Sequence, residues 1–141
     1  MQSTGDELQA IEASIQEILA YTVLFPGEHV SIHIIINPCA GAFSPKKRIT
    51  RVVAELRALR ELRTGERRDP SRLAVHFHHT EYPGHASEIA RELIGTTPAG
   101  VQIIVSAGGD GTHDEVLSAA VGDSRLIDRG AGRLYFFRFP F

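Results

Sequence analysis

Apolar residues along the chain fall into two kinds of pattern. Four short runs are rich in β-branched or aromatic residues, as in strands buried within a parallel sheet; they cover residues 30–37, 72–80, 101–107 and 133–139. Elsewhere apolar residues recur every three or four positions, which predicts helices over residues 6–24, 44–63, 82–94 and 112–121. This alternation of strands and helices predicts a three-layer α/β domain with a mainly parallel sheet.

Local signals set the expected ends of two of these helices. Thr4-Gly5-Asp6-Glu7 has the form of a capping box before the first helix, and Pro26-Gly27 should end it. The apolar stripe of this helix is narrow, and we expect it to pack on its own domain rather than on another subunit. Ser44 as N-cap, with Pro45 at the first helical position, should start the second helix.

Composition narrows the class of protein. The chain has 141 residues, 43% of them hydrophobic and 23% charged, with a net charge of −2. These values are ordinary for a soluble globular domain and give no argument for nucleic-acid binding. Residues 46–68 are different, because they hold nine Lys or Arg against three Glu. This segment is either a solvated helix face or a surface that attracts anionic lipid headgroups.

Cysteine usage and the chain start bear on the compartment. Cys39 is the only cysteine, so no internal disulfide and no CxxC metal pair can form. The acidic N-terminus lacks the basic region of a signal peptide, and no apolar run reaches the roughly 18 residues of a membrane span. We therefore expect a cytoplasmic setting, with contact at the membrane periphery as an option.

Three polar loops follow predicted strands directly. They read NPCAG (37–41), HHTEYPG (78–84) and AGGDGT (107–112). In a parallel sheet the carboxyl ends of the strands lie at one edge, where ligands of such sheets bind. The three loops should therefore form a single site.

The loop GGDGT has the properties of a phosphate-binding turn. Its glycines permit close backbone approach, and the helix that follows offers free N–H groups and a positive dipole end. It is not a P-loop, since GxxxxGK[ST] is absent, and it fails the GxGxxG fingerprint because Asp114 stands at the third glycine. If phosphate binds here, the Asp110 carboxylate should accept hydrogen bonds from N–H groups of the loop or contact the phosphate through Mg²⁺. Alternatively the loop is only a turn, with Thr112 and Glu115 forming a capping box.

The other two loops offer weaker signals. Asn37 supplies a side-chain amide, Pro38 stiffens the turn and Gly41 permits close approach. Thr80 offers a hydroxyl at the end of the second strand. Cys39 lies in the first loop, where we interpret it as a small filler because nothing nearby would activate the thiol.

The histidines invite a metal interpretation. His76 and His78 should share one strand face, but no third ligand has suitable spacing, so we interpret them and His79 as ordinary sheet or rim residues. His113 lies next to the glycine loop and could contact a ligand or face solvent.

Together the motifs NPxxG, T…GHA…IA and GGDGT followed by a Glu resemble the diacylglycerol kinase catalytic domain family, from about residue 31 onward. This family includes bacterial lipid kinases, sphingosine kinases and ceramide kinases, and NAD kinases share the GGDG[ST] element. The resemblance implies a nucleotide-binding α/β domain and transfer of the γ-phosphoryl of ATP, with Mg²⁺, to a lipid hydroxyl. It assigns the nucleotide site by position to Asn37, Pro38, Cys39, Ala40, Gly41, Thr80, Gly108, Gly109, Asp110, Gly111, Thr112, Asp114 and Glu115.

The chain departs from the family pattern in two ways. Asp114 stands where Asn is common, and Ala40 replaces a frequent Ser. The family also continues with a GTxND loop and a β-sandwich domain that carries the lipid site and the catalytic base, whereas this chain stops at RFPF. We therefore expect residues 1–28 to be a helical extension and residues 29–141 a truncated nucleotide-binding domain. Such a piece should hold no catalytic base and have little or no kinase activity.

Two alternatives remain open at this point. One is an NAD-kinase-like enzyme with the same loop and a soluble acceptor. The other is a non-catalytic domain that binds nucleotide or forms homo-oligomers.

Overall fold

The computed structural model describes residues 4–21, 25, 27–38, 69–96, 100–121 and 133–138. The elements in these ranges are α1 (Thr4–Ala20), β1 (Val30–Ile36), η2 (Pro70–Arg72), β2 (Leu73–His79), α3 (His85–Gly95), β3 (Val101–Ala107), α4 (Asp110–Ala120) and β4 (Arg133–Arg138). The helix expected over 44–63, the basic segment 46–68, and Cys39, Ala40 and Gly41 lie outside the described residues.

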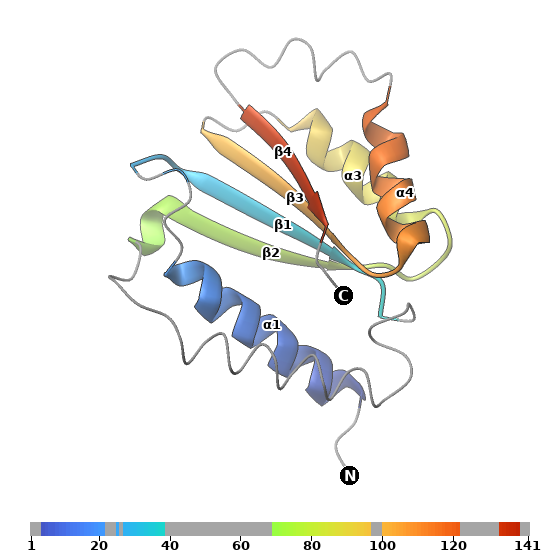
Figure 1. Ribbon diagram of the computed structural model, residues 1–141, viewed down its shortest axis with the longest axis horizontal. Coiled ribbons are helices and arrows are strands. Elements are labelled where there is room, and N and C mark those ends of the chain that lie inside the picture. Colours follow the sequence, from blue (N-terminus) through green and yellow to red (C-terminus); the bar gives the residue numbers. More distant parts are fainter. Residues whose placement is uncertain are drawn as a thin grey trace.

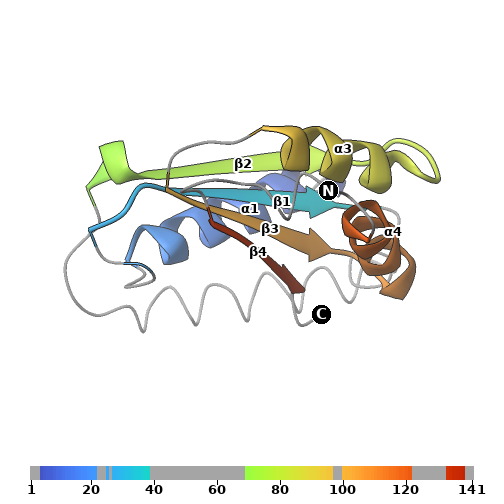
Figure 2. The same ribbon diagram turned by 90° about the horizontal axis from the view of Figure 1, so that it is seen from above.

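The four strands form one parallel sheet in the order β2-β1-β3-β4. All four arrows point the same way in Figure 2, so every carboxyl end lies at one edge. α1 lies on one face of the sheet, and α3 and α4 lie side by side on the other (Figure 1). This three-layer α/β arrangement with a parallel sheet confirms the predicted fold class.

The strands point their side chains alternately toward the two helical layers. On β1, Ile32, Ile34 and Ile36 join Ile11 and Ile15 of α1 in one buried cluster. Ile35 faces the other way and packs with α3 and α4. The central strands β1 and β3 are apolar on both faces because both faces are covered, which explains their nearly continuous hydrophobic runs.

Three of the predicted helix starts were wrong. α3 begins at His85 rather than at residue 82, because Gly84 turns the chain into the helix in a left-handed conformation. α1 already includes Thr4 and ends at Ala20, so Thr4 is not the residue before the helix that a capping box requires. α4 begins at Asp110 with Gly109 as its N-cap, so Thr112 lies inside the first turn. The turn between β3 and α4 is shorter than the pattern predicted. Gly109 is still extended and the helix begins at the next residue. The expected packing of α1 on its own domain is confirmed by the burial of Ile11 and Ile15 against the sheet.

Within the described residues, no helix combines the length and the apolarity needed to cross a bilayer.

Candidate functional site

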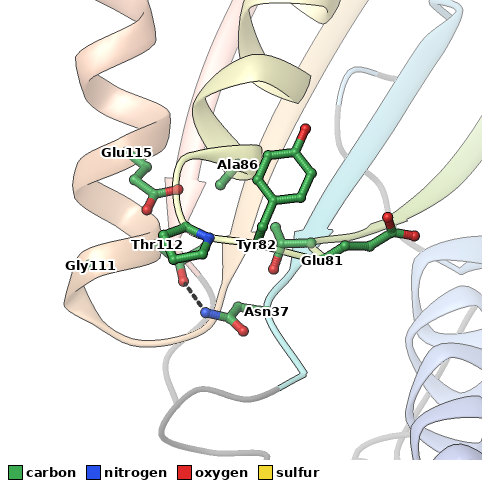
Figure 3. Close-up of a pocket in the computed structure, with 9 residues that line it drawn as sticks. Asn37, Glu81, Tyr82, Ala86, Gly111, Thr112 and Glu115 are labelled. Carbon is green, nitrogen blue, oxygen red and sulfur yellow. Dashed lines mark hydrogen bonds between the residues drawn. The ribbon is translucent and has the colours of Figure 1, made fainter.

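A pocket opens at the carboxyl edge of the sheet, with a volume of about 320 Å³. Small-molecule sites fall in the range of roughly 300–1,000 Å³. Its walls come from the end of β1, the β2–α3 loop, and the first turns of α3 and α4 (Figure 3). The lining residues are Asn37, Thr80, Glu81, Tyr82, Pro83, Ala86, Gly111, Thr112 and Glu115. The structure thus brings Asn37, from the first predicted loop, together with residues of the other two predicted loops at one site.

The end of β1 is tied to the first turn of α4. The Asn37 side-chain amide donates to Thr112 Oγ1 at 3.3 Å, and the Asn37 backbone N–H donates to the carbonyl of Ala107 at 3.0 Å. Thr112 is buried, and its hydroxyl is the point where the two segments meet (Figure 3). These bonds fix the spacing between the first and third loops.

Gly108 is required by the same close packing. A Cβ at this position would lie 2.7 Å from Thr112 Oγ1 and 3.3 Å from the Asn37 Cβ. Gly111 is different, because a Cβ there would meet no atom of the described residues within 4 Å. Gly111 lines the pocket, so its missing side chain leaves room for a ligand at the start of α4. Free N–H groups at such a helix start favour an anion.

Glu115 connects α4 to the β2–α3 loop. Its Oε1 accepts from the backbone N–H of Gly84 at 3.2 Å. Gly84 adopts a left-handed conformation (φ 88°) that turns the chain into α3, and L side chains rarely adopt it. The alternative in which Thr112 and Glu115 form a capping box is therefore wrong, because α4 begins earlier and Glu115 reaches across to the neighbouring loop instead.

Asp110 is the first residue of α4, and its side chain is 83% exposed. Its carboxylate forms an ion pair with Arg138 at the end of β4. Residue spacing does not predict this pair, since the contact depends on β4 lying beside β3. Among the described residues Asp110 thus faces an arginine, and the start of α4 carries the negative charge that suits its dipole.

The remaining predicted residues have varied positions. Thr80 lines the pocket, and Asp114 is exposed on α4 outside the lining. Pro38 follows β1 at the same edge, and Gly109 is the N-cap of α4. His113 neither faces solvent freely nor lines the pocket, because its Nδ1 shares a 2.8 Å hydrogen bond with Ser106 Oγ of β3.

Histidines gather under α3 rather than at the pocket. His76 and His78 share one face of β2, as predicted, and His33 of β1 joins them. The His33 Nδ1 lies 3.1 Å from His78 Nε2, and the His33 and His76 rings stack with centroids 4.8 Å apart. Burial, and then the neighbouring imidazoles, lower the pKa of His33 to about 4. In the described part of the chain, no three His, Cys, Asp or Glu side chains form a group that could hold a metal ion.

The sequence did not single out the wall formed by Glu81, Tyr82 and Pro83, although Ala86 beside them is part of the motif T…GHA…IA. The only signal for these three residues was their position directly after β2, in a loop already expected at the site. An aromatic residue in a polar loop has no periodic pattern that would mark it.

Comparison with known families supports this reading of the site. The family model for the diacylglycerol kinase catalytic domain matches residues 31–130, which is more than half of the chain. No curated protein matches the sequence. The matched range contains the ends of β1, β2 and β3, which carry all the pocket loops described above. The chain therefore belongs to the diacylglycerol kinase catalytic domain family.

Proposed function

We propose that this domain binds ATP together with Mg²⁺ in the pocket, and that it serves a kinase that phosphorylates a lipid hydroxyl. One observation supports this proposal most directly. The Asn37–Thr112 hydrogen bond and the close packing at Gly108 hold the N-terminus of α4 beside the pocket. The kinase class follows from the family, and the lipid acceptor is our further proposal.

The residues of the chain have separate roles in this proposal. The first-turn N–H groups of α4 would receive a phosphate, and Gly111 leaves the approach open. Thr112 and Asn37 hold the loops at fixed spacing, and Thr80 adds a hydroxyl to the wall. Phosphoryl transfer depends chiefly on such positioning and on charge stabilisation.

The charges of the site fit a nucleotide that carries its own metal. Glu81 and Glu115 line the pocket, although the Glu81 carboxylate points away from Thr112 (Figure 3). A carboxylate beside phosphates repels them unless a cation lies between the two. The described residues offer no ready-made metal cluster, so we infer that Mg²⁺ arrives with ATP and neutralises its phosphates. Glu115 lines the pocket and Asp110 is the first residue of α4, so these two carboxylates are the ones that we propose would meet this cation.

Calorimetry of the folded chain tests the binding step. MgATP should bind measurably, and ATP in excess EDTA should bind at least tenfold more weakly because the Glu115 charge is then unscreened. Inorganic phosphate with Mg²⁺ serves as a weak-binding control. A folded sample that gives no heat with MgATP would contradict the proposal.

The acceptor requires a transfer assay. A protein that includes the expected GTxND-like loop and β-sandwich domain should move the γ-phosphoryl from labelled ATP to extracted lipids. Label appearing on NAD instead would establish the NAD-kinase-like alternative. Because the acceptor is a membrane lipid in this proposal, we further propose a cytoplasmic protein that contacts the membrane peripherally.

A further inference from the structure

Tyr82 is an exposed aromatic side chain that is nevertheless held in place. The residue is 48% exposed, in the loop between β2 and α3. One face stacks on the His85 imidazole, with ring centroids 4.4 Å apart and planes within 8°. At the far end the Tyr82 hydroxyl donates to Glu88 Oε2. Contacts at a face and at the tip together restrict both side-chain torsions of the ring.

The support beneath Tyr82 is fixed as well. His85 is the first residue of α3, and its Nδ1 accepts from the backbone N–H of Glu81 at 3.0 Å. This bond leaves the proton of the neutral ring on Nε2. The hydrogen bond to Glu88 is the largest cause of a raised pKa of Tyr82, so the phenol stays protonated and continues to donate. Three interactions within residues 81–88 thus hold one aromatic plane.

This plane forms part of the pocket wall. Tyr82 lines the pocket on the side away from α4, and Glu115 lines it from α4 (Figure 3). His85 covers one face of the Tyr82 ring, and the ring remains half exposed, so its other face is available to a ligand. A fixed, flat π surface of this kind suits a flat aromatic ligand, which gains by offset stacking.

We propose that Tyr82 is the stacking platform for the nucleobase of the bound nucleotide, held ready by His85 and Glu88. This inference rests on the proposed nucleotide binding and adds the residue that recognises the base. The pocket is then divided, with the phosphates at the first turn of α4 and the base against the β2–α3 loop. Base recognition depends in this arrangement on an aromatic face that is already ordered before binding.

Removing the ring tests the division of the pocket. Calorimetry compares MgATP with magnesium tripolyphosphate, which has the phosphates and no base. Tyr82→Ala should weaken MgATP about tenfold, from the usual strength of base–aromatic stacking, and should leave tripolyphosphate within about twofold. Tyr82→Phe keeps the ring and should stay within about threefold of wild type for both.

A fluorescent reporter gives a second measurement, because the chain contains no tryptophan. Tyr82→Trp creates a single one, whose emission should be quenched by MgATP and not by magnesium tripolyphosphate. Phe137→Trp is a matched control: Phe137 is 50% exposed, and it pairs in register with Val105, which packs in the α1-side cluster. Its emission should not change with either ligand.

The outcomes separate this inference from the proposed function. If wild type binds MgATP and Tyr82→Ala binds it equally well, the platform is wrong and nucleotide binding stands. If Tyr82→Ala weakens both ligands equally, the residue supports the loop and does not recognise the base. If folded wild type binds neither ligand, the proposed function and the platform both fail.

Discussion

The two faces of the sheet are packed in different ways. Toward α1, isoleucine, valine and alanine form the buried cluster, in which Ile11 and Ile15 of α1 join residues of β1 and β3. Toward α3 and α4, the cluster includes the small residues Ala86, Ala90 and Ala119, and polar groups lie nearby. These polar groups are the imidazoles of the histidine group around His33, the hydrogen bond between Ser106 and His113, and the Gln102 side-chain amide, which donates to the Leu93 carbonyl.

Because of this difference, we expect folding stability and nucleotide binding to depend on different faces of the sheet. Large aliphatic side chains bury the most apolar area, so the α1 face should contribute mainly to the free energy of folding. Alanines let α3 and α4 approach the sheet and each other, which brings the first turns of both helices to the pocket. We expect changes on the α1 face to affect unfolding alone, and changes on the other face to affect nucleotide binding as well.

The largest expected effect comes from neighbouring residues that face opposite ways. Ile34 faces α1 and Ile35 faces α3 and α4, and both are 0% exposed. Ile34→Ala and Ile35→Ala should each lower the free energy of unfolding by about 3 kcal/mol, measured by urea denaturation. Only Ile35→Ala should also weaken MgATP binding per folded molecule, because Ile35 packs with Ala86 and Val116 near the pocket. Equal MgATP affinities in the two variants would contradict the expectation that only the α3 and α4 face affects nucleotide binding.

Two glycines of the β3–α4 turn should respond in opposite directions. Gly108→Ala forces a Cβ against Thr112 and should cost about 2 kcal/mol of stability. Gly111→Ala has open space in the first turn of α4 and should raise stability by about 0.5 kcal/mol. Both should weaken MgATP, the first by moving Asn37 and Thr112 apart and the second by filling the approach. Thermal unfolding with calorimetry measures both effects, and a stable Gly108→Ala with full affinity would contradict the packing argument.

The elements that the sequence predicted best are those set by local patterns. β3 was predicted with its observed ends, and β1 within one residue, because apolar runs on both faces are bounded by turn residues. The glycine loop was placed correctly beside Asn37, since parallel strands bring their carboxyl ends together. The start of α4 was wrong because Thr112–Glu115 matches a capping box that competes with the N-cap Gly109.

The features that the sequence missed depend on tertiary neighbours. The Asp110–Arg138 ion pair requires β4 to lie next to β3, and His33 meets His76 only through the β1–β2 register. Tyr82 has no helical or strand periodicity, and its support by His85 needs the left-handed turn at Gly84. None of these long-range arrangements is specified by residue spacing alone.

The histidine group of His33, His76 and His78, on the α3 side of the sheet, should make the free energy of unfolding depend on pH. His33 has a pKa of about 4 in the folded protein, against 6.5 when exposed, because burial and then His76 and His78 disfavour its charged form. The unfolded chain therefore binds the proton first, so this stability is complete above pH 6.5 and is lost as the pH falls through 4.

The His33 contribution should be on the order of 1 kcal/mol between pH 7.5 and 5, since the ring is only half-buried. His33→Gln removes the titrating group, while His76, His78 and Glu92 beside it remain. Urea denaturation at both pH values should show a smaller pH effect in the variant than in wild type. An unchanged difference would mean that the His33 charge is accommodated in the folded protein.

The smallest expected effect on stability comes from Glu115, which joins α4 to the β2–α3 loop. Glu115→Gln retains an oxygen that can accept from the Gly84 N–H, so the free energy of unfolding should change by only about 0.3 kcal/mol. Glu115→Ala removes the acceptor and should cost about 1 kcal/mol. Both variants lose the carboxylate charge, so both should bind Mg²⁺-free ATP more tightly than wild type does. The difference in affinity between MgATP and ATP in EDTA should therefore be smaller in both variants. If neither variant changes that difference, the Glu115 carboxylate acts only as a structural link on this face, and the metal requirement depends on Asp110 or on the nucleotide itself.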